Sequence, residues 1–176
     1  MHLARIAAAA LLLCTIQRAA AAEHVVLMVW DGMRPDFVTA ENSPTLHALA
    51  EKGVFFRNNH AVYPTSTNVN GAVFATGDYP AHNGIISNQE YRPEIDPLKQ
   101  FDTADFAALD ATDGKLNARY LAAPTVAEIV QKAGYRTAIA GSKPVAQLAD
   151  RTRNRPNQKS LVIYRGKVLP PSAEAT

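Results

Sequence analysis

Residues 25–36 read VVLMVWDGMRPD, an apolar run that stops at Asp31-Gly32. A continuous apolar run bounded by a turn signal is typical of a strand that is buried on both faces of a parallel sheet. Asp31 would then lie at the carboxyl end of the strand, the edge where open α/β sheets bind their ligands. The pattern predicts an α/β fold, with a mostly parallel sheet flanked by helices.

Three helices are predicted further along the chain from their start and stop signals. They cover residues 44–53, 67–76 and 124–134, with Ala72, Val73 and Ala75 of the second and Val126, Ile129, Val130 and Ala133 of the third packed inward. Glycine ends each of them, at Gly53, Gly77 and Gly134.

Extended segments are predicted between and after these helices. Short strands are expected at 54–56, 60–63 and 135–141, and a hairpin at 161–169 around Arg165-Gly166. The third helix and the strand after it belong to a βαβ unit. Residues 87–120 have weak periodicity and many turn formers, which predicts an irregular excursion near the mouth of a site.

The start of the chain has the pattern of a secretory signal. Arg5 precedes an apolar run, Ile6 to Ile16, and the alanines up to Ala22 provide a cleavage site. The run is too short to span a bilayer, so we expect export to a periplasm or the exterior without a stable membrane span. The alternative is a buried Ala/Leu-rich N-terminal helix.

Cysteine content and charge exclude several classes of site. Cys14 is the only cysteine and lies inside the predicted signal, so a disulfide framework or a cysteine-based metal site is not expected. A net charge of +2 does not favour a nucleic-acid partner. The one basic cluster, Arg151, Arg153, Arg155 and Lys159, is more typical of a solvated loop than of an anion site.

Most of the candidate catalytic residues lie in segments around Thr67. It lies in YPTSTNVN, residues 63–70, and is followed by TGDYP at 76–80 and NGIISN at 83–88. With Asp31 upstream, these segments supply a hydroxyl, a carboxylate and an amide, the groups that metal-assisted phosphoryl or sulfuryl transfer uses. A threonine at a helix start would also bring a phosphoryl group to backbone N–H donors.

In this order and spacing, the four segments resemble the type I phosphodiesterase and nucleotide pyrophosphatase family of the alkaline phosphatase superfamily. Residues 31–36 match its D-G-x-R-P-D and residues 64–70 its P-T-x-T-x-x-N, and the resemblance covers about residues 25–145. The resemblance implies an alkaline-phosphatase-like fold that hydrolyses phosphodiester or pyrophosphate bonds of a small phosphate ester.

The resemblance also assigns roles to three residues. Thr67 would be the nucleophile and a metal ligand, Asp31 a metal ligand, and Asn88 a hydrogen-bond donor to a non-bridging phosphate oxygen. Two divalent metal ions, expected to be Zn²⁺, would take part. The family is much longer and carries most of its metal ligands in its later half, so residues 23–176 are expected to be the N-terminal part of a catalytic domain, incomplete at the C-terminus and inactive alone.

Each of these residues also has an ordinary structural interpretation. Thr67 could be a helix cap, Asp31 a turn residue and Asn88 a loop asparagine. Arg34 and Asp36 are expected to stabilise the turn after the strand. The histidines show no paired metal-ligand spacing, and Lys143-Pro144 is expected in a structural loop.

Two departures from the family pattern bear on substrate preference. Asn68-Val69-Asn70-Gly71 stands where the family commonly has Phe-Pro-Asn-His, and Asn83 replaces a histidine, with His82 one place early. Both positions are expected to shape the pocket wall.

Other functions remain alternatives. A non-catalytic exported remnant or binding module could keep the same fold. A sulfatase would need a modifiable Cys or Ser at position 67, and a mutase relative would need Ser there. The leading hypothesis requires the side-chain oxygens of Asp31 and Thr67 to converge on one cation.

Overall fold

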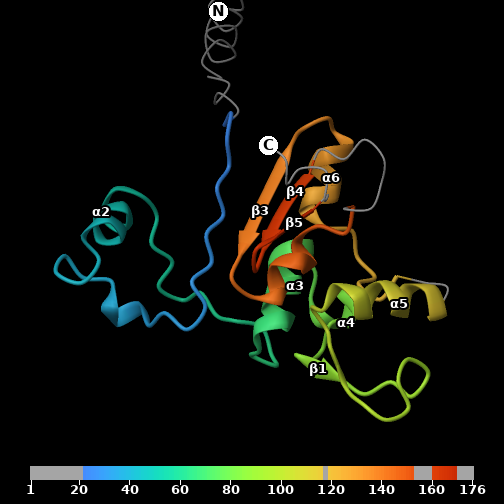
Figure 1. Ribbon diagram of the computed structural model, residues 1–176. Helices are drawn as coiled ribbons and strands as arrows, with labels where there is room; N and C mark the ends of the chain where they lie inside the picture. Colours follow the sequence, from blue (N-terminus) through green and yellow to red (C-terminus); the bar gives the residue numbers. More distant parts are fainter. Residues whose placement is uncertain (1–21, 117–118, 153–159, 170–176) are drawn as a thin grey trace, which may run out of the picture. The chain divides into compact units, whose positions relative to one another are not determined.

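The computed structural model describes residues 22–116, 119–152 and 160–169 (Figure 1). The predicted signal, residues 1–22, lies outside the described residues except for its last position. The chain divides into two units, Met1–Leu49 and Ala50–Thr176, and each is described by itself.

The first unit contains a short 3₁₀ helix, η1 (Pro35–Phe37), and most of α2 (Pro44–Lys52). Arg34 Nε and Nη2 donate to the Asp36 carboxylate at 3.0 and 2.5 Å, so these two residues stabilise the turn as predicted. Pro44 begins α2 and Gly53 follows its end, as expected.

The apolar segment Val25–Trp30 does not form a strand, and its prediction as one buried on both faces is wrong. Its side chains are between 87% and 50% exposed. Residues 54–56 and 60–63 are likewise outside any strand. Apolar content indicates that a segment gains from burial, but a strand also needs a hydrogen-bonding neighbour, and none of these segments pairs with one in the described sheets.

Helix α3 (Thr67–Thr76) has the predicted bounds. Gly77 ends it in the left-handed region, with φ 74°, and its N–H donates to Val73 O at 2.7 Å. Ala72 and Ala75 are buried as expected, whereas Val73 is only half-buried. The short α4 (Pro80–Asn83) follows and ends at Gly84, also left-handed.

Residues 87–120 are more regular than predicted. Strands β1 (Gln89–Glu90) and β2 (Phe101–Asp102) pair antiparallel, and α5 (Phe106–Leu116) follows. Asp105 Oδ1 accepts the Ala108 N–H at 2.8 Å and so satisfies a donor at the start of α5. This capping hydrogen bond favours the helix more than Gly114, which lies inside it, disfavours it.

Helix α6 (Val126–Lys132) begins with a capping box, in which Thr125 Oγ1 and the Glu128 carboxylate each accept the other residue's N–H. The predicted inward stripe is wrong, because Val126 and Ile129 are 50% and 54% exposed and Ala127 is the buried residue. Gln131 instead attaches the helix to its surroundings, donating to Thr137 Oγ1 and Asp150 Oδ2.

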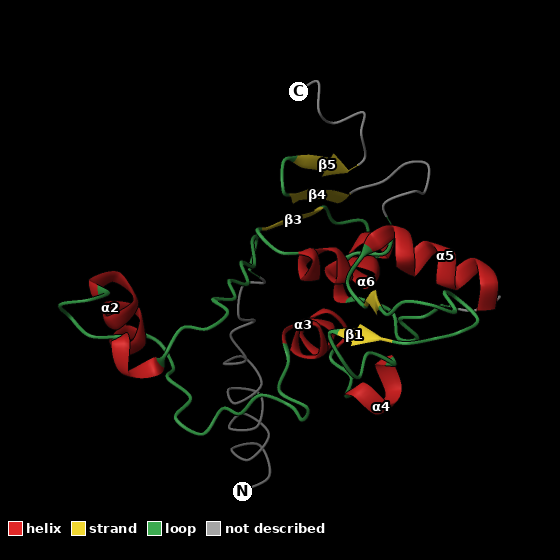
Figure 2. Ribbon diagram, turned by 60° about the horizontal axis from the view of Figure 1, so that its bottom comes forward, coloured by secondary structure: helices red, strands yellow, loops and turns green. Residues whose placement is uncertain are grey.

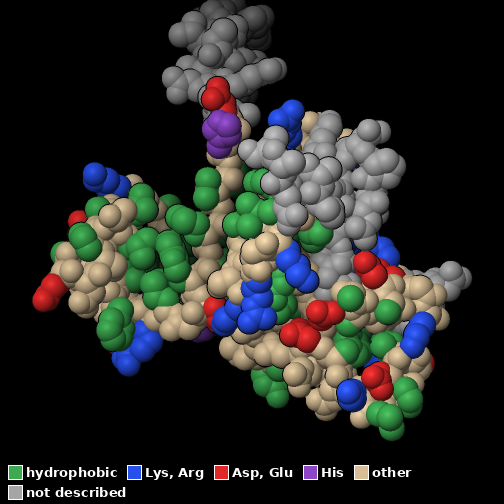
Figure 3. All heavy atoms as spheres, viewed as in Figure 1, with side chains coloured by type: hydrophobic (Ala, Val, Ile, Leu, Met, Phe, Trp, Pro, Cys, Tyr) green, Lys and Arg blue, Asp and Glu red, His purple; other side chains and the backbone are tan. Residues whose placement is uncertain are grey.

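Figure 3 shows that hydrophobic side chains reach the surface in both units.

The larger described sheet has the order β3 (Thr137–Gly141), β4 (Ser160–Tyr164), β5 (Lys167–Leu169) (Figure 2). β3 and β4 are parallel, while β4 and β5 form the predicted hairpin. Arg165 and Gly166 both have positive φ, as a two-residue hairpin turn requires. Helices and sheets together give an α/β structure, but a mostly parallel sheet is not confirmed, because the described sheets are small and mixed.

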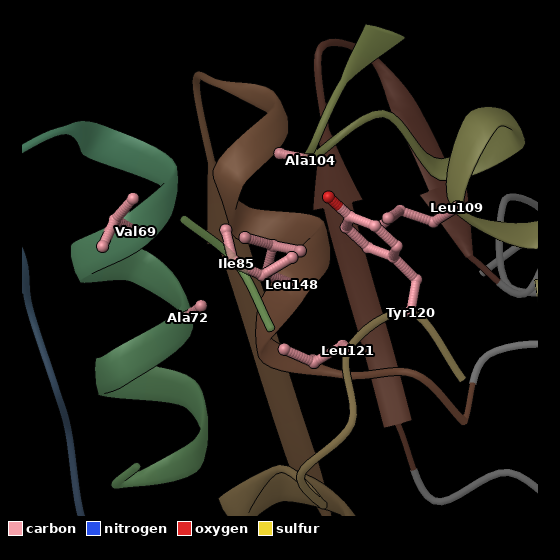
Figure 4. Packing of buried hydrophobic residues seen from close by; sticks show 8 residues of the cluster. All are labelled: Val69, Ala72, Ile85, Ala104, Leu109, Tyr120, Leu121 and Leu148. Atoms are coloured by element: carbon pink, nitrogen blue, oxygen red, sulfur yellow. The ribbon is translucent and has the colours of Figure 1, made fainter. Parts of the chain in front are cut away.

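The core of the second unit lies between α3 and the 3₁₀ helix η2 (Pro144–Ala149), together with the segments after α4 and around α5 (Figure 4). Its buried members are Val69, Ala72, Ile85, Ala104, Leu109, Tyr120, Leu121 and Leu148. η2 occupies the position of the loop expected at Lys143-Pro144. α3 approaches it so closely that a Cβ on Gly71 would overlap Val145 Cγ2.

Arg151 corrects the expectation of a solvated basic loop. Its side chain is 4% exposed and lies 2.8 Å from Asp113 Oδ2 and 3.5 Å from Asp110 Oδ1. Arg153, Arg155 and Lys159 lie outside the described residues.

Tyr120 is a buried phenol in an ionic neighbourhood. Its ring packs edge-on against Phe101, and the Arg92 guanidinium lies 5.1 Å from the ring centroid. Burial raises the pKa of Tyr120, and the Glu90 carboxylate raises it further, while Arg92 opposes the shift. The folded-state pKa of Tyr120 lies above the unfolded value of about 10. The neutral phenol therefore contributes its full share of folding stability below about pH 10, and this contribution is lost as the pH rises towards the folded-state pKa.

We therefore expect Tyr120→Phe to change stability by less than about 1 kcal/mol at pH 7 and to gain about 1 kcal/mol relative to the parent chain at pH 11. Denaturant unfolding between pH 7 and 11 measures this difference. The matched control is Tyr135→Phe, since Tyr135 is 68% exposed. Parallel pH curves for Tyr120→Phe and the parent would contradict the prediction.

Candidate active site

Thr67 is the first residue of α3, in the second unit. Ser66, which precedes it in extended conformation, is the N-cap residue, and its side chain makes no capping hydrogen bond. Thr67 is therefore the first helical residue and not the N-cap residue of α3.

Asn88 supplies the cap that Ser66 does not. Its Oδ1 accepts the backbone N–H of Asn68, the second residue of α3, at 2.8 Å. The structure thus brings the side chain of Asn88 to the helix start that carries Thr67. Because the carbonyl end of its carboxamide faces the helix, the NH₂ end is directed elsewhere and can donate.

Asn68 makes hydrogen bonds at this helix start that the sequence did not predict. Its side chain is 6% exposed, and Nδ2 lies 2.8 Å from Asp102 Oδ1, 3.0 Å from Thr103 Oγ1 and 3.2 Å from Asn88 O. Its departure from the family's phenylalanine was the available signal. The partners, 34 and 35 residues away in the chain, were not predictable from spacing.

Asn70 fixes the segment that leads into the helix. Its Oδ1 accepts the Val62 N–H at 3.0 Å and its Nδ2 donates to Ser66 O at 3.1 Å. The Tyr63–Pro64 peptide bond between them is cis. The matched motif around residues 64–70 therefore forms a closed turn followed by the helix.

Asp31 lies in the first unit, so its placement is described apart from that of Thr67. Asp31-Gly32 forms a turn in which Met33 N–H donates to Trp30 O at 3.4 Å and Gly32 has φ 80°. Among the described residues, no group of three or more His, Cys, Asp or Glu side chains could hold a metal ion.

Asn83 does not shape a pocket wall as expected, because it is fully buried. Its Nδ2 donates to Asp78 O at 2.8 Å and its Oδ1 accepts the Ile85 N–H at 2.9 Å. The residue holds the turn around α4 together. His82 is exposed and lies 3.9 Å from Asp78 Oδ1.

Residues 25–171 match the model of the family described as type I phosphodiesterase / nucleotide pyrophosphatase. The chain belongs to this family. The resemblance predicted from the four sequence segments is thereby confirmed, and with it the assignment to a family of phosphate-ester hydrolases.

Several curated members of the family are similar over part of the chain. Venom phosphodiesterase 2 of Crotalus adamanteus is 38% identical over 69 residues, which is 38% of this chain and 8% of the relative. The human ectonucleotide pyrophosphatase/phosphodiesterase family member 1 is 33% identical over 72 residues, 40% of this chain and 8% of the relative. Ectonucleotide pyrophosphatase/phosphodiesterase 1 of Saccharomyces cerevisiae is 31% identical over 77 residues, 40% of this chain and 10% of the relative.

The matched part of the chain therefore spans about a tenth or less of these family members. No solved structure matches the chain. None of the helices in the described residues has the length and apolar character that crossing a membrane requires.

Proposed function

We propose that the chain forms part of a metal-dependent hydrolase that cleaves phosphodiester or pyrophosphate bonds through the hydroxyl of Thr67. The observation that supports this most is the placement of the Asn88 carboxamide at the start of α3, one residue from Thr67. In the proposed reaction this placement would bring the nucleophile and a neutral donor to the same phosphate.

The residues have distinct roles in the proposed reaction. The Thr67 hydroxyl loses its proton as its oxygen forms a bond to phosphorus and the bond to the leaving oxygen breaks, and the leaving group takes up a proton. Water then cleaves the phosphothreonine ester, which releases a phosphate monoester and restores the hydroxyl. Asn88 donates from Nδ2 to a non-bridging oxygen, where charge develops. The N-terminal end of α3 favours the same negative charge through its backbone dipoles.

The oxygen atoms of Asp31 and Thr67 are suitable ligands for divalent metal ions, but two side chains are too few to hold two ions. A carboxylate at Asp31 and a hydroxyl at Thr67 are acceptable ligands for Zn²⁺. Two such ions, when bound, would lower the pKa of the hydroxyl and neutralise charge on the phosphate oxygens. We propose that Asp31 and Thr67 converge to hold one of them and that other ligands come from residues outside this sequence.

The same proposal covers the fold and the compartment. Residues 23–176 would form the N-terminal part of an alkaline-phosphatase-like catalytic domain with a mostly parallel sheet. Residues 1–22 would direct export to a periplasm or the exterior, in keeping with the venom and ecto- names of the relatives. The substrate would be a small phosphate ester, such as the nucleotides named in the relatives' titles.

Metal binding tests the role of Asp31. In the full-length protein that carries this sequence, Asp31→Asn should reduce bound zinc and lower turnover of a chromogenic phosphodiester by at least about 100-fold, since metal affinity depends on a charged ligand. Asp36→Asn is the matched control, because Asp36 is an exposed carboxylate of the same unit that pairs with Arg34. Unchanged zinc content and turnover in Asp31→Asn would contradict the proposed ligand.

The alternative is a non-catalytic exported binding module, and the shortage of clustered metal ligands in the described part of the chain favours it. We expect the 176-residue chain alone to show no turnover. A full-length protein that binds phosphate esters without hydrolysing them would favour the module. Hydrolysis of a sulfate ester or phosphate transfer within a sugar phosphate would instead indicate the sulfatase or mutase alternatives.

A further inference from the structure

The first turn of α3 is joined to two distant segments by one polar network, which is buried at Asn68 and Thr103 and exposed at Asn88. Asn68 bonds to Asn88 twice, through its backbone N–H to Oδ1 and through its side-chain Nδ2 to the backbone oxygen. Its Nδ2 also lies within hydrogen-bond distance of Asp102 and Thr103. Thr103, fully buried, donates in turn from Oγ1 to Ser87 O.

The network fixes the orientation of both asparagine side chains. The Asp102 carboxylate can only accept, so it selects the NH₂ end of the Asn68 carboxamide. The Asn68 N–H can only donate, so it selects the carbonyl end of the Asn88 carboxamide. The Asn88 NH₂ group is consequently the end left for a substrate oxygen.

Burial makes this arrangement rigid. A buried amide that loses a partner is costly, because water does not replace the missing hydrogen bond. Asn68 therefore restrains the separation between Thr67, its neighbour in the helix, and Asn88, its partner across the network. Small displacements of groups that contact a reacting phosphate reduce rates strongly.

We propose that Asn68 is a positioning residue: its side chain, held by Asp102 and Thr103, also binds the backbone oxygen of Asn88 and so places the Asn88 NH₂ group against the phosphate to be attacked by Thr67. This inference rests on the proposed function. Asn68 touches neither substrate nor reacting atoms, and its effect on the reaction passes through Asn88.

A double-mutant cycle in the full-length protein tests this dependence. With a chromogenic phosphodiester, Asn88→Ala should lower kcat by about 100-fold and Asn68→Ala by about 10-fold, with smaller changes in KM. The double variant should be no slower than Asn88→Ala. Asn68 acts on the reaction only through the Asn88 donor, which that variant already lacks. Inhibition by orthovanadate, a phosphate mimic, should weaken in the same non-additive way.

A matched control separates positioning from a loss of stability. Asn83→Ala also removes a buried carboxamide with two backbone partners. Its effect on kcat, if any, should add to that of Asn88→Ala. Asp102→Asn keeps an acceptor oxygen, so it should retain most of the kcat that is lost in Asp102→Ala. This pair of variants replaces Asn68→Ala as the test if Asn68→Ala does not fold.

The results distinguish failure of the inference from failure of the proposed function. Additive effects of Asn68→Ala and Asn88→Ala, in an active protein that Thr67→Ala inactivates, would overturn the positioning role alone. Absence of turnover in the unmodified full-length protein would overturn the proposed function. NMR then decides the geometry, because Asn68→Ala should shift the Asn88 side-chain NH₂ signals and an unchanged spectrum would contradict the network.

Discussion

Thr67→Ala should lower phosphodiester turnover by the full-length protein by about 10⁴-fold to 10⁶-fold, because removal of a nucleophile leaves only binding and electrostatic contributions to the rate. Thr67→Ser, which keeps the hydroxyl, should retain activity within about tenfold of the parent. Steady-state kinetics with one chromogenic diester measures both variants.

Thr65→Ala provides the control for this experiment. Its exposed hydroxyl lies two residues before Thr67 and donates to Val62 O at 3.3 Å, in the turn that leads into α3. We expect a change of less than about tenfold, since a single exposed hydrogen bond contributes little. Comparable losses in Thr65→Ala and Thr67→Ala, or high activity in Thr67→Ala, would assign the nucleophile elsewhere.

The second large effect concerns folding of the second unit. Asp150 is fully buried, and its carboxylate accepts hydrogen bonds from Gln131 of α6, Ser160 of β4 and Thr152. Asp150→Ala should destabilise the chain by about 3 kcal/mol or more, because donors of α6, of β4 and of the segment at Thr152 lose their buried acceptor. Denaturant unfolding monitored by circular dichroism measures the loss.

Two variants define what the carboxylate contributes. Asp150→Asn keeps one acceptor oxygen and a similar shape, so it should lose less stability than Asp150→Ala. Asp110→Ala removes a more exposed carboxylate, 3.5 Å from Arg151, and should cost about 1 kcal/mol or less. Equal unfolding midpoints for Asp150→Ala and Asp110→Ala would show that the buried network does not hold these elements together.

The parts of the fold that were predictable from sequence are those whose chemistry is local. Gly77 and Gly166 adopt a backbone conformation that other residues rarely adopt, so the end of α3 and the hairpin turn were placed correctly. The predictions that failed, at Val25–Trp30 and along α6, assumed partners for an apolar face. The identity of such partners depends on tertiary structure, which hydrophobic periodicity does not encode.

The candidate site shows the same division. Thr67 and Asn88 were selected because they lie in short motifs, and the structure places their segments side by side. Asn68 was visible only as a departure from the family pattern, since its partners Asp102 and Thr103 come from a region predicted to be irregular. Asp31 and Thr67 remain proposed metal ligands, and the described residues contain no cluster of three or more His, Cys, Asp or Glu side chains that could hold a metal ion.

The close approach of α3 to η2 has an evolutionary consequence. Gly71 has no room for a methyl group while Val145 keeps its present rotamer. Homologues with alanine or a larger residue at position 71 should therefore tend to carry a smaller side chain at position 145. These two positions are 74 residues apart in the sequence. Covariation between them would indicate that homologues keep the close packing of the helix that carries Thr67 against η2.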